Sequence, residues 1–178
     1  MENEQPKAEM TTRSVGIKYG LFMALAGIAY FVIMNIMNVD MTQGVGRWGS
    51  MIFYIALIFL AHKYYKDNGN GFMSYGQGMG ITFWMSLLSS VLGSIFTWIY
   101  VKFIDTEYIQ KMLDKQEEAF VANGMSDEQI RQAMSMTAKF MTPEMMLVFG
   151  IVFGIIIILI VGLIVTIFTQ KRNPEIPV

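Results

Sequence analysis

The sequence contains no cysteine, a single histidine and four prolines in 178 residues, and charged residues make up only 15% of the chain. Without cysteine, the chain has no disulfide, thiolate metal site, iron–sulfur cluster or cysteine nucleophile. Its formal net charge of −1 provides no basic surface for nucleic acid. No catalytic motif, cofactor fingerprint or metal-ligand cluster stands out. The sequence therefore predicts no enzyme, no cofactor, no metal and no nucleic-acid partner.

Apolar residues are abundant, and their longest run covers 145–169. These twenty-five residues carry no charge, and eighteen of them are Leu, Ile, Val or Phe. A helix of that length spans roughly 37 Å, which is enough to cross a hydrocarbon core of about 30 Å. Within lipid only a helix or a closed barrel satisfies every backbone polar group, and a run without alternation excludes a barrel strand. This segment is predicted to be a membrane-spanning helix.

Three further apolar segments predict an all-α integral membrane protein with four transmembrane helices. The predicted helices cover about 15–37, 48–65, 81–103 and 145–169, in a single domain over 15–170. A disordered polar N-terminus, 1–14, precedes this domain, and a basic tail with prolines, 171–178, follows it. The alternative to the first helix is a cleaved signal peptide, but the apolar run is about twice as long as a signal core and its start is acidic.

The segment 105–142 turns hydrophilic and carries amphipathic patterns. Asp105 or Thr106 can cap a first helix, and Asn123-Gly124 provides its stop. Ser126 with Gln129 forms a capping box for a second helix. We expect an external amphipathic helical hairpin, whose apolar faces lie on the bilayer, on each other or, as a further possibility, on a partner.

Small residues recur at helical spacing in three of the predicted membrane helices, where they let two backbones approach closely. A serine repeat can also line a water path, and the G-x-x-x-G motif in the last helix marks packing within one chain as readily as dimerisation. The candidate helix-packing residues are Gly16, Gly20, Ala24, Gly27, Ser86, Ser90, Ser94, Gly150 and Gly154.

Two other features invite functional interpretations that their surroundings do not support. His62 lies near a predicted membrane edge without other ligands nearby in the sequence, which favours a headgroup-level residue over a metal ligand or proton carrier. The segment 66–80 contains five glycines. It lacks the Gly-Lys-Ser/Thr ending of a P-loop and the preceding strand of a dinucleotide fingerprint, so a flexible turn is expected.

The distribution of charge predicts the orientation of the chain. Four crossings place both termini on one side, where basic residues lie densely next to the membrane segments. The region 103–143 carries seven acidic and four basic residues, a net charge of −3. The positive-inside rule therefore predicts cytoplasmic termini and an external hairpin.

The order of these features resembles a known family. A first helix opening with "KYG", a second ending in "YYKDNGNGFMSYGQG", and the segment "DTEYIQKMLDKQEEAFVANGMSDEQIRQ" before a last apolar helix are similar to domain-of-unknown-function family 4199. The similarity covers about residues 13 to 170. A distinctive part of the family pattern is a "GGF.S(F/Y)G"-like turn at 69–78, and this chain departs slightly from it with Gly69-Asn70-Gly71. The resemblance implies a small four-helix, multi-pass membrane protein of Bacteroidota, located in the bacterial inner membrane. It implies no activity.

Three functions remain open at this point. The first is a non-catalytic scaffold or a regulatory or accessory subunit, with the lipid bilayer and another membrane protein or a second copy as partners. The alternative is an oligomeric channel or small-solute transporter, although the central turns of the helices carry no ionisable residue. A lipid-acting enzyme would have to use Asp114, Glu117 and Glu118, whose spacing is that of a solvated helix face.

Overall fold

The computed structural model describes residues 10–39 and 44–172, and this part of the chain is helical apart from short connections and one isolated β-bridge. The elements are α1 (Thr12–Ile36), α2 (Gly44–Asn68), α3 (Tyr75–Ile99), the π-helical turn η1 (Tyr100–Ile104), α4 (Tyr108–Ala122), α5 (Asp127–Phe140) and α6 (Pro143–Thr169). The all-α prediction is confirmed for the described residues. Parts of the predicted N-terminus (1–9), first connection (40–43) and tail (173–178) lie outside them.

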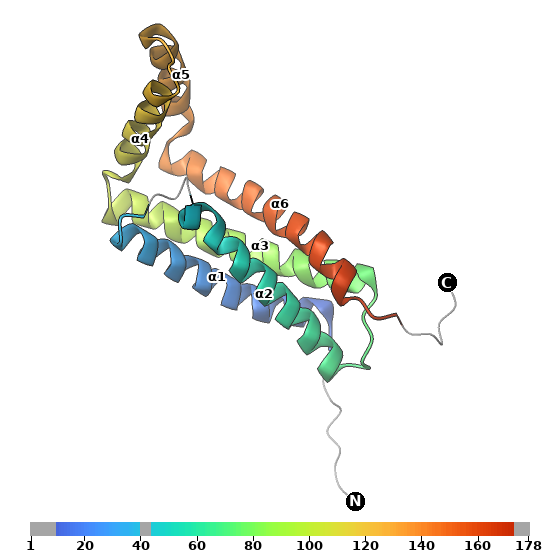
Figure 1. The fold of residues 1–178 in the computed structure, drawn as a ribbon. Coiled ribbons are helices and arrows are strands. Elements are labelled where there is room, and N and C mark those ends of the chain that lie inside the picture. The colour runs from blue at the N-terminus through green and yellow to red at the C-terminus, as the bar shows by residue number, and fades with distance from the viewer. Residues whose placement is uncertain (1–9, 40–43, 173–178) are drawn as a thin grey trace, which may run out of the picture.

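The four long helices α1, α2, α3 and α6 lie alongside one another, and α4 and α5 extend from one end of this bundle (Figure 1). Helix α3 packs against both α1 and α6, and α2 packs mainly against α1 and α6. At the end opposite α4 and α5, Met73 and Lys171 exchange two backbone hydrogen bonds of 2.8 Å each. This bridge joins the α2–α3 connection to the residues that follow α6.

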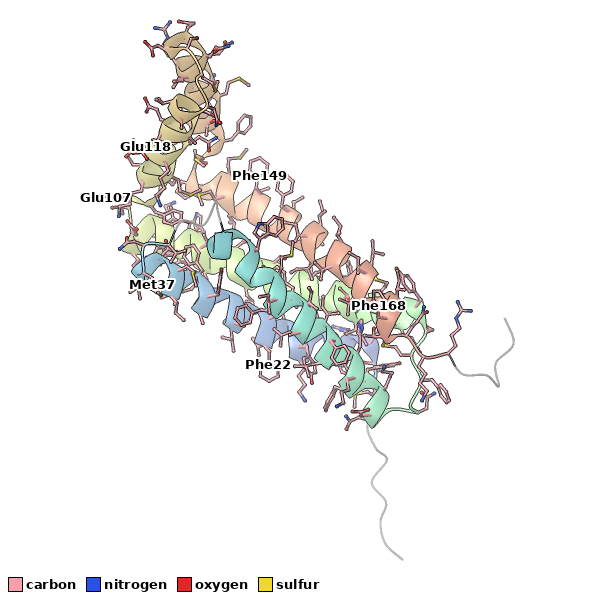
Figure 2. All side chains as sticks on the ribbon, in the orientation of Figure 1. Phe22, Met37, Glu107, Glu118, Phe149 and Phe168 are labelled. Carbon is pink, nitrogen blue, oxygen red and sulfur yellow. The ribbon has the colours of Figure 1, made fainter. Side chains whose placement is uncertain are left out.

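Apolar side chains cover the outside of the bundle. Phe22 on α1 is 50% exposed and Phe168 on α6 is 82% exposed, and both project away from the helices (Figure 2). Three helical segments are long and apolar enough to cross a membrane: α1, α3 continued by η1, and α6. Helix α2 is not among them, so the predicted count of four spans stays a prediction.

Helix α3 begins earlier than the sequence predicted. Residues 66–80 were expected to form a flexible turn, but α2 continues to Asn68 and α3 starts at Tyr75. The reason is a capping box, in which the Ser74 hydroxyl accepts from the Gln77 backbone N–H at 3.2 Å and the Gln77 side chain accepts from the Ser74 N–H at 2.8 Å. Three of the five glycines in this segment therefore lie in a helix. Helix α1 likewise starts at Thr12, inside the stretch predicted to be disordered.

The helix signals between α3 and α6 are confirmed with one exception. The Ser126–Gln129 capping box starts α5, and α4 stops at Ala122 before Gly124, whose φ is +75°. The predicted cap at Asp105 or Thr106 is wrong, because Glu107 occupies the N-cap position without a side-chain hydrogen bond. Asp105 instead accepts from Lys111 at 3.2 Å, and this hydrogen bond raises the pKa of the Lys111 ammonium.

Candidate functional site

Helices α3 and α6 approach each other through small residues that face one another at positions four or eight residues apart. A Cβ added to Gly150 would lie 2.5 Å from the Ser94 Oγ, and one added to Gly154 would lie 2.6 Å from the Ser90 Oγ. The facing pairs are Gly150 with Ser94, Gly154 with Ser90, Gly162 with Thr82, and Thr166 with Gly78. The residue numbers rise along α6 as they fall along α3, so the two helices are antiparallel and stay in one register for four turns.

Helix α1 approaches the other face of α3 in the same manner. A Cβ on Gly16 would lie 2.5 Å from the Trp84 Cβ, and one on Gly20 would lie 3.1 Å from the backbone of Met85. Ser86, also on α3, is fully buried and donates to the Phe83 carbonyl at 2.8 Å. The structure thus places Gly16, Gly20 and the facing pairs of α3 and α6 at contacts between neighbouring helices of one chain.

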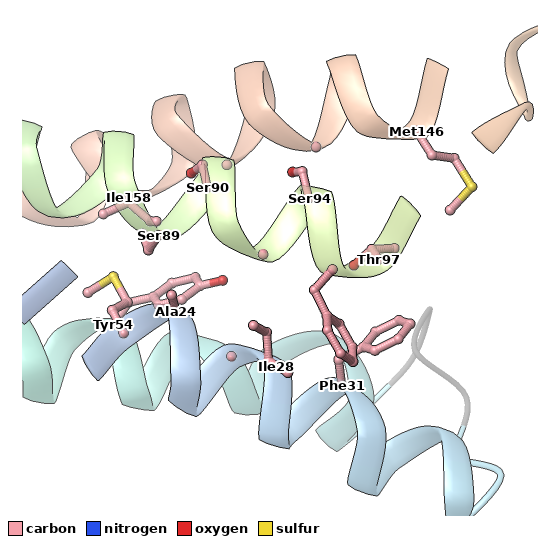
Figure 3. Close-up of a pocket in the computed structure, with 16 residues that line it drawn as sticks. Ala24, Ile28, Phe31, Tyr54, Ser89, Ser90, Ser94, Thr97, Met146 and Ile158 are labelled. Carbon is pink, nitrogen blue, oxygen red and sulfur yellow. The ribbon is translucent and has the colours of Figure 1, made fainter. Parts of the chain in front are cut away.

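The remaining candidates, Ala24 and Gly27, lie on the wall of a cavity of about 310 Å³ between the long helices (Figure 3). The wall also contains Ser90, Ser94, Gly150 and Gly154. The other lining residues are Met23, Ile28, Phe31, Tyr54, Ser89, Gly93, Phe96, Thr97, Met146 and Ile158. The cavity occupies the half of the bundle nearer to α4 and α5, because its α1 wall ends at Phe31 and its α6 wall begins at Met146.

A second polar group gathers around His62 near the opposite end. The expectation of a headgroup-level histidine is wrong, because the side chain is fully buried within the protein. Its Nδ1 lies 2.7 Å from the Thr169 Oγ1, and its Nε2 lies 3.0 Å from the Gly78 carbonyl oxygen. Since a carbonyl can only accept, Nε2 is the donor to Gly78. The Thr169 hydroxyl, the partner of Nδ1, also lies 2.9 Å from the Val165 carbonyl oxygen and shares its single proton between these two acceptors.

Lys66 extends this group by donating to the Thr169 carbonyl at 2.7 Å, one turn after His62 on the same helix. Together the two residues tie α2 to the C-terminal end of α6 and to the first turn of α3. The sequence did not reveal this group, because Thr169 lies 107 residues from His62. No pattern in a single sequence reports a contact at that separation.

The described residues contain no group of three or more His, Asp or Glu side chains arranged to hold a metal ion. His62 has a hydroxyl and a backbone carbonyl as partners. Asp114 accepts from the Gln110 amide at 2.7 Å on the exposed face of α4. The arrangement offers buried hydrogen-bonding groups and an apolar cavity, and both suit packing or the binding of a neutral molecule.

The buried histidine generates a stability prediction. Replacing His62 with Leu removes two buried hydrogen bonds, so we expect a loss of about 1–3 kcal/mol in the free energy of unfolding. The adjacent exposed Lys63, replaced by Leu, is the control and should change the stability by about 0.5 kcal/mol or less. Unfolding of the purified proteins in mixed micelles measures both. Equal stability of the two variants would contradict a structural role for His62.

Comparison with known proteins identifies a family for almost the whole chain. No curated protein and no solved structure matches the sequence. A family model described as "Protein of unknown function (DUF4199)" matches residues 18–171. This range includes the α3–α6 contacts, the cavity and the buried histidine group described above, and Gly16 lies just before it. The chain therefore belongs to the DUF4199 family.

Proposed function

We propose that this protein is a non-catalytic scaffold or accessory subunit of a bacterial cytoplasmic membrane, and that it binds a partner protein through α4 and α5. The observation that carries the proposal is the position of this helix pair. It extends away from the bundle, and Ile130 is its only buried residue. A pair of helices with so little contact to the rest of the chain leaves its faces available to a second protein.

The surface of the pair combines apolar and charged groups. Val121, Met136 and Phe140 are 60%, 58% and 53% exposed, which is unusual for large apolar side chains outside a membrane. Acidic residues outnumber basic ones over 103–143, with a net charge of −3. A partner with an apolar anchor and a basic rim would complement this surface.

The proposal includes α2 as a fourth span. This helix has 25 residues, which corresponds to a length of about 37 Å, and it runs along the whole bundle. Near its start the Gly46 carbonyl accepts from the Tyr30 hydroxyl at 3.2 Å, and near its end His62 and Lys66 reach Thr169. Between these contacts α2 exposes Ile52, Ile55 and Phe59, as a lipid-facing helix does.

With four spans, the chain would place its termini in the cytoplasm and the α4–α5 hairpin outside. This orientation is supported by basic residues at the end of the bundle opposite α4 and α5. Arg13 lies over the Trp84 ring at 5.2 Å, Lys18 lies over the Tyr64 ring at 3.9 Å, and Lys171 lies over the Phe72 ring at 5.4 Å. These cations lie beside aromatic rings at the end that would face the cytoplasm.

An oligomeric channel or small-solute transporter is the second candidate function. The cavity between the helices and its serine side chains favour it, since hydroxyl groups can line a path for a small solute. The close α3–α6 contact disfavours it, because that contact uses the small residues within one chain. A pore would therefore have to form from another face of the bundle.

The proposed orientation predicts which end of the bundle is accessible from outside the cell. Because the chain contains no cysteine, single variants carry a unique thiol. We expect Asn123→Cys to react with an impermeant maleimide in intact cells, or in spheroplasts where an outer membrane is present. Asn70→Cys, an exposed asparagine at the opposite end, should react only after permeabilisation. The reverse pattern would contradict cytoplasmic termini, and labelling of both sites without permeabilisation would contradict a membrane crossing by α3, which separates the two sites.

The partner-binding role predicts site-specific cross-linking in native membranes. A photoreactive amino acid at Met136 should capture the same heterologous protein in repeated experiments. The same group at Phe153, which is 56% exposed on α6, should capture lipid. In a separate affinity purification of tagged protein, the Met136→Asp substitution should reduce recovery of the partner at least about tenfold, since an apolar anchor is lost. Capture of lipid alone at Met136 would contradict the proposal, and self-oligomers linked at Phe153 would favour the channel.

A further inference from the structure

We propose that the cavity between the four long helices binds a neutral single-chain amphiphile, with the hydroxyl or carbonyl oxygen of that molecule hydrogen-bonded to Ser90. The cavity has a volume of about 310 Å³ and takes its walls from α1, α2, α3 and α6. This binding site is separate from the α4–α5 surface, so it does not depend on the partner-binding role.

The chemistry of the walls restricts the ligand to a neutral and mostly apolar molecule. None of the sixteen lining residues is charged, and most of their exposed atoms are apolar, contributed by side chains such as Met23, Phe31 and Ile158. An ionised group placed here would lose its hydration without gaining an ion-pair partner, which is strongly unfavourable. A phosphate or a carboxylate therefore does not fit, whereas a hydrocarbon chain does.

Two glycines on the wall leave space instead of bringing helices together. A Cβ added to Gly27 on α1 or to Gly93 on α3 would meet nothing within 4 Å. Gly150 and Gly154 behave differently, because a Cβ on either would collide with a serine of α3. Helix packing thus explains the glycines of α6 but not those at 27 and 93, which instead widen the cavity.

The hydroxyl of Ser90 provides the polar contact. Ser90 is 7% exposed, and its Oγ has no hydrogen-bond partner among the described residues. The neighbouring Ser89 satisfies its own hydroxyl by donating to the Met85 carbonyl at 2.8 Å. An unpaired buried hydroxyl costs free energy that a ligand oxygen can recover. Ser90 lies on the α3 wall of the cavity one turn before Ser94, and its hydroxyl is on the side of α3 that faces α6 (Figure 3).

The volume sets the size of the ligand. An apolar cavity of about 150 Å³ accommodates benzene, so a cavity of about 310 Å³ accommodates roughly twice as many heavy atoms. Decanol, with ten carbons and one oxygen, matches this size and has one hydroxyl group. A longer lipid chain would fill the cavity with its first carbons and leave the remainder in the bilayer.

The test uses the full-length protein in phospholipid nanodiscs with two photoreactive probes, a diazirine analogue of decanol and a diazirine analogue of decane. We expect the alcohol probe to label cavity residues of α1 and α3, with mass spectrometry identifying the peptides. Unlabelled decanol should suppress this labelling. The Ser90→Ala variant should lower the preference for the alcohol over the alkane by about five- to tenfold, the factor expected for one hydrogen bond.

Two glycines of α3 provide a matched pair of variants. Gly93→Leu places a side chain in the cavity and should reduce cavity labelling at least tenfold. Gly76→Leu is the control, because a Cβ at Gly76 also meets nothing within 4 Å but this residue does not line the cavity. Gly27→Leu fills the cavity from α1 and serves as a second variant if Gly93→Leu does not fold.

Unchanged cavity labelling in the folded Gly93→Leu or Gly27→Leu variant would overturn the proposal. So would labelling spread over lipid-facing residues such as Phe22 and Phe168 without competition by decanol. Equal labelling of the wild-type protein by the alcohol and the alkane would exclude the hydrogen bond to Ser90 and with it the proposed ligand class.

Discussion

The close antiparallel approach of α3 to α6 is the contact on which the rest of the bundle depends. Lipid chains are as apolar as leucine, so helices in a membrane associate through packing and hydrogen bonds and not through the hydrophobic effect. Glycine facing serine or threonine at four positions along the contact lets the two backbones lie close enough for extensive dispersion contact. Because α3 also receives α1 through Gly16 and Gly20, it forms the centre of the bundle.

The two ends of this central helix serve different purposes. At the end near its N-terminus, the His62 group and the Met73–Lys171 bridge fix α2, α3 and α6 relative to one another. At the other end the helices leave a cavity, and Phe31 on its wall lies 5.2 Å from the Tyr100 ring and 5.8 Å from the Tyr108 ring of α4. An aromatic contact thus connects the wall of the cavity with the start of the α4–α5 pair.

Local patterns predicted much of this fold, and contacts distant in sequence account for what they missed. The uncharged run 145–169 and the Ser126–Gln129 capping box depend only on neighbouring residues, so they were readable. The start of α3 was missed because five glycines dominate the composition of 66–80, although Ser74 and Gln77 have the spacing of a capping box. The buried state of His62 depends on Thr169 and Gly78, which only the folded chain brings together.

Disulfide formation between introduced cysteines tests the α3–α6 register most directly, since the native chain has no cysteine to interfere. A Cβ at Gly150 would lie 3.3 Å from the Ser94 Cβ, close to the spacing that a disulfide requires. In native membranes under mild oxidation, Ser94→Cys with Gly150→Cys should form an intramolecular disulfide rapidly. Ser94→Cys with Gly154→Cys, one turn out of register, should not. Equal rates for the two pairs, or disulfides between separate chains, would contradict the contact.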